Sequence, residues 1–335
     1  MRIIIPMAGM GKRMRPHTLT IPKPLIPIAG KPIVQRLVED IAKVCQEPIE
    51  EVAFIIGDFG KAVEERLVKI AESVGARGTI SYQDEPLGTA HAILCAKESL
   101  EGKVVVAFAD TLFKADFTLD TSADGTIWVQ KVEDPRPFGV VKLNDRDEIT
   151  DFVEKPDTFV SDLAIIGIYF FQDGAYLRRE MQYLIDNNIK DKGEFQLTNA
   201  LENMKNKGTV FVPARISEWL DCGNKDATVY TNQRYLEYIQ ENQDLVAGSA
   251  QITNSVLIPP VYIGENAVVN NSVVGPHVSI GKGTQVSGSV IHNSIVQENS
   301  QLINTNISNS MLGNFVVYEG KPRDLSLGDY NVLKE

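Results

Sequence analysis

The sequence predicts an α/β domain with a mostly parallel β-sheet, followed by a left-handed parallel β-helix. Two observations lead to this fold class. Residues 1–245 alternate between short apolar runs, typical of buried strands, and amphipathic runs, typical of helices. From about residue 250 the helical period is lost, and aliphatic residues instead recur every five or six positions. We therefore expect one domain at 1–245, a β-helix at 250–320 and a C-terminal tail at 321–335.

The first domain begins with a continuous apolar run at residues 2–7, which suits a strand buried on both faces. Pro32, a residue favoured at the first helical position, then opens an amphipathic helix. The next expected elements alternate: a strand at 52–56, a helix at 61–74, a strand at 79–83, a helix at 89–99 and a strand at 103–109. This order implies a mostly parallel sheet with helices on both faces.

In the C-terminal part, a period near six with Gly and Asn in the intervals is the signature of a left-handed parallel β-helix. The aliphatic residues expected to point inward are Ile263, Val268, Val274, Ile280, Val286, Ile291, Val296, Leu302, Ile307 and Leu312. Each coil buries its aliphatic side chains only against neighbouring coils. We therefore expect an obligate stack that also packs against other subunits in a homo-oligomer.

Composition narrows the class of protein. The chain has 335 residues, of which 43% are hydrophobic and 23% charged, as in ordinary globular proteins. No apolar run approaches the roughly 18–20 residues that span a membrane, and the N-terminus resembles a strand rather than a signal peptide. Cys45, Cys95 and Cys222 lack metal-type spacing, and their odd number favours free thiols in the reducing cytoplasm. The net charge of −11 argues against a nucleic-acid partner.

The charge is unevenly distributed along the chain. The first acidic residue is Glu39, and seven basic residues precede it: Arg2, Lys12, Arg13, Arg15, Lys23, Lys31 and Arg36. The stretch from Lys12 to Lys23 lies in a Gly- and Pro-rich loop directly after a strand, and parallel sheets bind ligands beyond the carboxyl ends of their strands. We therefore predict an anion site in this loop, whereas Arg2 and Arg36 suit a solvated surface equally well.

The loop reads Ala8-Gly9-Met10-Gly11-Lys12-Arg13-Met14-Arg15-Pro16. It is not a Walker A loop, because no Gly lies five positions before Gly11 and no Ser or Thr follows Lys12. It is not the dinucleotide pattern G-x-G-x-x-G either, because position 14 is Met. A lone Gly-x-Gly is weak evidence, but here it continues into Pro22-Lys23-Pro24-Leu25 and Gly30-Lys31-Pro32.

With these motifs the chain resembles the sugar nucleotidylyltransferases, which join a nucleoside triphosphate to a sugar 1-phosphate and release pyrophosphate. That family's pattern is roughly A-G-x-G-T-R-L-x-P-x-T, then P-K-P-L-x-P and G-K-P. Further matching segments are Leu87-Gly88-Thr89-Ala90-His91-Ala92, Phe138-Gly139-Val140, Glu154-Lys155-Pro156, Gly167-Ile168-Tyr169, Gly193-Glu194 and Trp219-Leu220-Asp221-Cys222-Gly223. The matches cover residues 2 to about 235 and imply a Rossmann-like domain; a β-helical tail accompanies many members.

The resemblance implies roles for the charged residues. Arg13 and Lys23 would be the catalytic residues, stabilising the triphosphate and the charge that develops during in-line attack at the α-phosphorus. The planar guanidinium of Arg13 suits phosphoryl oxygens, and two prolines stiffen the backbone around Lys23. Asp110 and Asp221 would hold Mg²⁺, which prefers a few carboxylates together with phosphate oxygens and water.

Two groups of substrate-binding residues follow from the same resemblance. Glycines let backbone N–H groups approach phosphates, and a Gln five residues before a Gly is the spacing with which the family reads a pyrimidine base. The nucleotide-binding residues are then Ala8, Gly9, Gly11, Lys12, Gln83, Gly88 and Thr89. The residues for the sugar phosphate are Gly139, Glu154, Lys155 and Glu194, with Glu154 accepting from sugar hydroxyls and Lys155 positioning the 1-phosphate.

Three positions depart from the family's pattern. Lys12 replaces a small hydroxyl residue, Ala109 replaces the Gly that usually precedes Asp110, and Asn199 stands where an Asp is common. None of these changes removes a catalytic group. They do make the sugar specificity harder to infer from the resemblance.

The favoured reaction uses dTTP or UTP with glucose 1-phosphate. The alternative is that the protein is a mannose-1-phosphate guanylyltransferase. A second class is a non-catalytic relative that binds nucleotide sugars for regulation. Such a protein is expected to lose a catalytic or metal-binding residue, yet all four are present: Arg13, Lys23, Asp110 and Asp221. A third class adds acyl transfer by the β-helix, which needs a general base. His277 and His292 are the candidates, but neither lies in a recognisable catalytic loop insertion, so a scaffold for oligomerisation is favoured.

Overall fold

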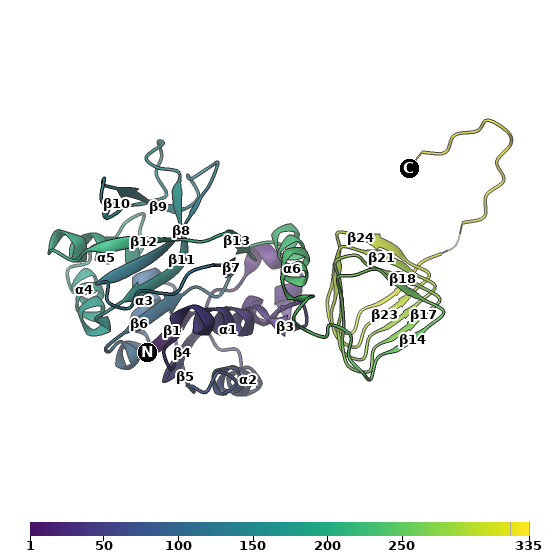
Figure 1. The fold of residues 1–335 in the computed structure, drawn as a ribbon, viewed down its shortest axis with the longest axis horizontal. Helices are drawn as coiled ribbons and strands as arrows, with labels where there is room; N and C mark the ends of the chain where they lie inside the picture. The colour runs from purple at the N-terminus through teal and green to yellow at the C-terminus, as the bar shows by residue number, and fades with distance from the viewer. Residues whose placement is uncertain (322, 335) are drawn as a thin grey trace. The chain divides into compact units, whose positions relative to one another are not determined.

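The computed structural model describes residues 1–321 and 323–334 (Figure 1). The expected tail at 321–335 includes Pro322 and Glu335, which lie outside the described residues. None of the described helices combines the length and the apolar character that crossing a membrane requires.

The chain forms two compact units. The first unit consists of Met1–Ile26 and Lys31–Thr228, and the second consists of Pro27–Gly30 and the chain from Val229 onward. The short segment Pro27–Gly30 therefore belongs with the C-terminal part, which the sequence did not indicate. The domain bounds 1–245 and 250–320 stay a prediction.

The first unit contains most of the regular elements. Its strands are β1 (Arg2–Pro6), β3 (Lys31–Pro32), β4 (Glu51–Ile56), β5 (Arg77–Tyr82), β6 (Val104–Ala107), β7 (Thr111–Lys114), β8 (Gly125–Lys131), β9 (Gly139–Leu143), β10 (Ile149–Glu154), β11 (Leu163–Phe171), β12 (Phe211–Arg215) and β13 (Glu218–Asp221). Its α-helices are α1 (Ile33–Cys45), α2 (Lys61–Glu72), α3 (Thr89–Leu94), α4 (Gly174–Asp186) and α5 (Leu197–Asn206). Short 3₁₀ turns are η1 (Lys12–Met14), η2 (His17–Leu19), η3 (Lys23–Leu25) and η4 (Lys97–Ser99).

The main sheet has the strand order β10-β9-β11-β6-β1-β4-β5, with β8 paired to both β11 and β12. The strands β6, β1, β4 and β5 are parallel, as the alternating sequence predicts. The long strand β11 runs antiparallel to β6, β8 and β9, so the complete sheet is mixed. The topology is therefore a parallel half (β6, β1, β4 and β5) extended by an antiparallel half (β8, β9, β10 and β11), to which β12 adds in parallel with β8.

Both faces of the parallel half are covered. Ile4 and Ala53 lie in one hydrophobic core with residues of α3, α4 and α5, three helices that contact one another (Figure 1). Neighbouring strand residues point to opposite faces, and Ile3 and Ile5 are also fully buried. The apolar positions expected in the helix after Pro32 are all buried in α1: Ile33, Val34, Leu37, Val38, Ile41 and Val44.

One expected helix is interrupted. The prediction placed a single helix at 89–99, whereas α3 ends at Leu94 and the separate turn η4 follows. Between them, Ala96 leaves helical geometry, with φ −104° and ψ 35°. This break allows both Leu94 and Leu100 to be buried in the core below the sheet, which a continuous helix does not achieve at a six-residue spacing.

The second unit is a parallel β-helix. Helix α6 (Lys225–Ile239) begins in the first unit, ends in the second and precedes the β-helix in the sequence. The short strand β2 (Pro27–Ile28) is also part of the second unit. The coil strands are β14 (Gln251–Thr253), β15 (Val256–Leu257), β16 (Val261–Ile263), β17 (Val268–Asn270), β18 (Val273–Val274), β19 (Val278–Ile280), β20 (Gln285–Ser287), β21 (Val290–His292), β22 (Ser294–Val296), β23 (Gln301–Ile303), β24 (Asn306–Ser308), β25 (Met311–Leu312) and β26 (Val317–Glu319).

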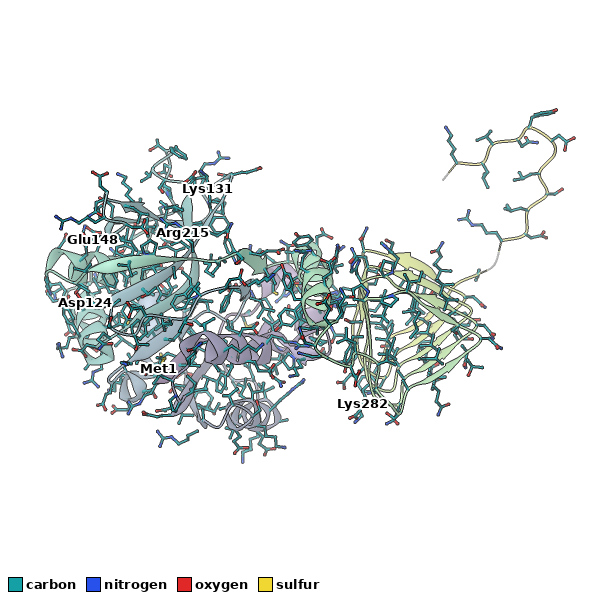
Figure 2. The ribbon with its side chains drawn as sticks, viewed as in Figure 1. Met1, Asp124, Lys131, Glu148, Arg215 and Lys282 are labelled. Atoms are coloured by element: carbon teal, nitrogen blue, oxygen red, sulfur yellow. The ribbon has the colours of Figure 1, made fainter. Side chains whose placement is uncertain are left out.

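These strands stack into three parallel sheets, β14-β17-β20-β23-β26, β15-β18-β21-β24 and β16-β19-β22-β25, consistent with the predicted left-handed β-helix. Charged side chains such as that of Lys282 project outward (Figure 2). The Nζ of Lys282 lies 2.8 Å from Glu265 Oε2 on the neighbouring coil.

All but one of the predicted aliphatic residues belong to the hydrophobic core of the β-helix or pack against it, together with Val261 and Val278, which were not predicted. On β17 the fully buried residue is Val269, and Val268 is only half-buried. Two adjacent valines made the choice of face ambiguous in the sequence.

The end of the stack also has a sequence reason. Leu302 pairs with Tyr318, a step of 16 residues. The same step from Ile307 and Leu312 leads to Arg323 and Gly328, which cannot supply an apolar core. Regular pairing accordingly ends at β26 within the described residues.

We predict that Val269→Ala destabilises the β-helix by about 2 kcal/mol, because it empties a fully buried position. The matched variant Val268→Ala removes the same atoms from a half-buried position and is expected to cost less than about 1 kcal/mol. Urea unfolding of the two variants measures the difference. An equal or reversed effect would show that the strand presents its other face to the core.

Candidate active site

The two predicted metal ligands are brought together by a short antiparallel pair of strands. In the pair β7–β13, Asp221 lies opposite Thr111, the residue that follows Asp110. The backbone N–H of Cys222 donates to the carbonyl oxygen of Asp110 at 2.9 Å. The carboxylates of Asp110 and Asp221 therefore approach one another although they lie far apart in the sequence.

This arrangement is electrostatically unfavourable without a cation. Burial and the neighbouring charge of Asp110 raise the pKa of Asp221, against the opposing effects of Lys23 and Arg13. The backbone N–H of Gly223 donates to Asp221 Oδ1 at 3.0 Å and fixes the side chain. Gly223 also leaves room for Arg13, because a methyl group added there would lie 3.0 Å from Asp221 Oδ1 and 3.3 Å from Arg13 Nη2.

Lys23 completes the cluster. Its Nζ lies 2.8 Å from Asp110 Oδ2, and its side chain is only 13% exposed. The side chain packs on the Gly-rich loop, since a methyl group added at Gly11 would lie 3.0 Å from Lys23 Cβ. Gly11 itself has φ +56°, a left-handed conformation that favours glycine, and its carbonyl oxygen accepts from Thr18 Oγ1 at 2.8 Å.

Two adjoining cavities meet at this cluster. The first, of about 270 Å³, is lined by predicted nucleotide-binding residues, namely Ala8, Gly9, Gln83, Gly88 and Thr89, together with Lys23. The second, of about 590 Å³, is lined by all four predicted sugar-phosphate residues and by Arg13 and Asp221: Arg13, Gly139, Glu154, Lys155, Glu194 and Asp221. Asp110, Thr89 and Glu194 line both cavities.

Two predicted nucleotide-binding residues lie elsewhere. Gly11 and Lys12 line neither cavity, and the Lys12 side chain is exposed. Gly11 shapes the loop through its positive φ and its contact with Lys23, as described above. Lys12 places its positive charge on the surface of the loop.

In the first cavity, backbone packing explains the glycine at 88. Gly88 has φ +121°, and a methyl group added to it would lie 2.5 Å from the carbonyl oxygen of Phe195. The flanking residues bond to the same partner, with Ala90 N donating to Phe195 O at 2.9 Å. The side-chain amide of Gln83 lies 3.2 Å from His91 Nδ1, which orients it at the cavity wall.

In the second cavity, polar groups surround Glu154. Lys155 Nζ lies 3.4 Å from Glu154 Oε1, and Thr198 Oγ1 donates to Glu154 Oε2 at 3.4 Å. Gly139 stands opposite Glu154 in the β9–β10 pair, and a methyl group there would lie 3.2 Å from the carboxylate. Burial, and secondarily the charge of Glu154, raises the pKa of the Tyr169 phenol in the same cavity.

Sequence reasoning missed the aromatic wall of the second cavity. Phe138 and Trp219 both line it, with ring centroids 4.9 Å apart in an edge-to-face arrangement. Trp219 Nε1 lies 3.4 Å from Thr111 Oγ1. The available signal was the spacing of Trp219 and Asp221, because residues two apart in a strand share a face. Phe108, which lines both cavities, carried no comparable signal.

The donor set fits Mg²⁺. Two aspartates stand beside cavities suited to a phosphate ester, and Mg²⁺ is commonly held by one or two carboxylates plus substrate phosphates and water. Among the described residues, no group of three or more His, Cys, Asp and Glu side chains forms a metal site from protein ligands alone. An ion between Asp110 and Asp221 would therefore take its remaining ligands from substrate and water.

Several known proteins are similar to this chain. Low-salt glycan biosynthesis nucleotidyltransferase Agl11 of Haloferax volcanii is 30% identical over 246 residues, which cover 71% of this chain and 66% of that protein. Bifunctional protein GlmU of Methanococcus maripaludis is 29% identical over 264 residues, covering 77% and 60%. Mannose-1-phosphate guanylyltransferase catalytic subunit beta of Danio rerio is 30% identical over 280 residues, covering 79% and 74%. The chain thus spans less than two thirds of the length of the first two relatives.

A solved structure and two family models agree with the fold. A crystal structure of UDP-glucose pyrophosphorylase complexed with UDP-glucose matches with a TM-score of 0.58 at 23% identity, covering 71% of this chain and 98% of that one. A GlmU-like C-terminal hexapeptide model matches residues 241–319. The nucleotidyl transferase model matches residues 2–238, well over half of the chain. On this match, the chain belongs to the nucleotidyl transferase family.

Proposed function

We propose that this chain catalyses Mg²⁺-dependent transfer of a nucleotidyl group from a nucleoside triphosphate to a sugar 1-phosphate, releasing pyrophosphate. The observation that carries the proposal is the junction of the two cavities. There two carboxylates and two cations, Asp110, Asp221, Lys23 and Arg13, surround the place where the two substrates would meet. The similarity to enzymes named as nucleotidyl- and guanylyltransferases supports the same reaction class.

The reaction is a direct displacement at the α-phosphorus. An oxygen of the sugar 1-phosphate, held in the second cavity near Lys155, attacks the α-phosphorus, and the bond to the β-phosphate oxygen breaks as pyrophosphate leaves. No proton has to be removed, because the attacking oxygen is already anionic. A bound Mg²⁺ supplies positive charge to the phosphate oxygens.

The chain's own cations share that task. Lys23 exchanges its pairing with Asp110 for triphosphate oxygens when the nucleotide binds, which frees the carboxylate for the metal ion. Arg13 borders the second cavity beside Asp221, where its planar guanidinium can bind two phosphoryl oxygens at once. Positioned charges of this kind act mainly on the transition state, in which negative charge is redistributed over the phosphoryl oxygens.

For the substrates, dTTP or UTP with glucose 1-phosphate is our first choice. Gln83 and Gly88 both line the first cavity, and the Gln83 amide together with a backbone group suits the edge of a pyrimidine. Mannose 1-phosphate with GTP is the second candidate, which the resemblance to the Danio rerio guanylyltransferase subunit favours. Cys45, Cys95 and Cys222 form no disulfide within the described part of the chain, which fits a cytoplasmic enzyme.

For the β-helix, we favour a scaffold for homo-oligomers. The alternative is acyl transfer, since a second activity would fit the match to a relative named as bifunctional. Its general base would be His277, whose Nε2 lies 2.9 Å from Glu237 Oε1, or His292, whose Nδ1 lies 3.4 Å from Ser308 Oγ, and neither lies in a recognisable catalytic loop insertion. Consumption of acetyl-CoA by the purified protein would favour the alternative.

The first test of the proposal is an assay of substrates. Purified protein with Mg²⁺ is incubated with each nucleoside triphosphate and a panel of sugar 1-phosphates, and pyrophosphate release is measured. We expect release that depends on both substrates, highest with dTTP or UTP and glucose 1-phosphate. Absence of release in every combination would contradict the proposed function.

The second test addresses the carboxylates. Asp110→Asn and Asp221→Asn are each expected to lower kcat by at least roughly 10²–10³, because each removes a charge that binds the metal ion beside the reacting phosphate. Asp145→Asn, at an exposed position outside both cavities, serves as the matched control and keeps the wild-type rate. Wild-type rates in both site variants would show that the metal site is misplaced.

The third test concerns stability and pH. Because the folded state raises the pKa of Asp221, its ionised form destabilises the fold, and this cost grows as pH rises through the folded pKa. We therefore expect Asp221→Asn to have a higher Tm than wild type at pH 7.5 without metal, with the difference narrowing as pH falls toward about 4. Mg²⁺ should raise the Tm of wild type more than that of the variant. Thermal unfolding followed by circular dichroism measures both, and a lower Tm for the variant at pH 7.5 would contradict the argument.

A further inference from the structure

The turn that follows the Lys23 segment is held by the second unit. Pro27–Gly30 belongs to that unit, while Met1–Ile26 and the chain after Gly30 belong to the first. Within the second unit, the backbone N–H of Ala29 donates to Asn232 Oδ1 at 2.9 Å, a buried bond between residues 203 positions apart. The turn therefore has a specific, long-range anchor.

Asn232 is a fully buried polar residue of α6 that joins two segments. Its Oδ1 also accepts from Ser279 Oγ on β19 at 2.8 Å. Because two donors face the same atom, the oxygen of the amide must occupy this position. Its Nδ2, also buried, has no hydrogen-bond partner within the described part of the chain. An unpaired buried donor destabilises the fold, and the two bonds to Oδ1 offset this effect.

A second contact holds the same turn. Gly30 has φ +84°, and a methyl group added there would lie 2.1 Å from Cζ of the Tyr262 ring. The glycine backbone is thus in close contact with an aromatic side chain of β16 in the β-helix. A displacement of the turn would have to break this packing as well as the Asn232 bond.

The chain between the turn and Lys23 is short and stiff. Ile26 N donates to Lys23 O at 3.0 Å, and Leu25 N donates to Pro22 O at 2.9 Å. Pro24 and Leu25 are buried, and proline restricts the backbone on either side of it. Only three residues separate Lys23 from Pro27, so a shift of the turn is passed to the backbone that carries the Lys23 side chain.

We propose that Asn232 is a positioning residue for Lys23, so that the β-helical unit sets the geometry of the reaction as well as serving as a scaffold. The effect of Asn232 on catalysis rests on the proposed function, whereas its effect on the backbone at Leu25 and Ile26 does not. Misplacement of a catalytic group by about 1 Å can cost on the order of 10²-fold in rate. Loss of the Asn232 bond alone is expected to lower the rate about tenfold.

Hydrogen exchange tests the backbone part directly. In Asn232→Ala, exchange of the Leu25 and Ile26 amides should accelerate at least about tenfold relative to wild type, because the turn loses its anchor. The matched control is Ser289→Ala, which removes a buried hydroxyl of the β-helix that bonds to Ser287 and Thr305 instead of the turn. Unchanged exchange in Asn232→Ala, or equal acceleration in both variants, would overturn the proposal.

A double-mutant cycle tests the catalytic part. Asn232→Ala should lower kcat about tenfold with little change in KM for the sugar phosphate, and it should have almost no effect when Lys23 is already replaced in Lys23→Ala. An equal loss in both backgrounds would indicate a general structural role and overturn the proposal. Inactivity of wild-type protein with every substrate pair would contradict the proposed function alone, since the exchange result stands independently.

A second variant covers the case in which Asn232→Ala does not fold. Gly30→Ala disturbs the same turn by overlap with the Tyr262 ring and by strain at φ +84°. It should show the same faster exchange at Leu25 and Ile26 and the same dependence on Lys23. Normal exchange at both amides in folded Gly30→Ala would overturn the proposal.

Discussion

The close approach of Asp110 and Asp221 is the constraint on which the rest of the site depends. The antiparallel pair β7–β13 holds two carboxylates together in a partly buried place, and burial, followed by the charge of Asp110, raises the pKa of Asp221. Like charges in such a place need nearby cations. Lys23 and Arg13 supply part of that charge, and a divalent ion between the two carboxylates would supply more. The fold thus keeps a pair of like charges at a place where a bound cation would make the pair favourable.

The location of that pair follows from the topology of the sheet. The parallel strands β1 and β6 both end near the cavities, and the loop after β1 carries the basic residues while Asp110 follows β6. The antiparallel half then adds β9, β10 and β11, which supply Gly139, Glu154 and Tyr169 to the second cavity. The two cavities therefore arise from the two halves of one mixed sheet, with the charged cluster between them.

Local patterns predicted the parallel strands, the helix after Pro32 and the β-helix, because buried strands, amphipathic helices and stacked coils each impose a short-range period on the sequence. What no period reveals is the pairing of strands, so the antiparallel half remained unpredicted. A one-residue shift of face, as at Val268 and Val269, is also invisible when both residues are apolar. In the site, the resemblance named the charged residues that line the cavities, together with Gly11 and Lys12, which line neither cavity. The aromatic contact of Phe138 with Trp219 depends on tertiary packing and left only a weak signal.

The assignment of Pro27–Gly30 to the second unit bears on how the two parts of the chain relate in function. A scaffold that only assembles subunits needs no contact with the segment that follows Lys23. Here, Asn232 keeps a buried, incompletely satisfied amide whose oxygen bonds to that segment, and Gly30 fits closely against Tyr262. An apolar residue at 232 would avoid the unpaired donor but would leave the Ala29 N–H and the Ser279 hydroxyl without their acceptor. The amide destabilises the interior through its unpaired Nδ2, and we explain its presence by the bond with which its oxygen places the turn and, through the turn, Lys23.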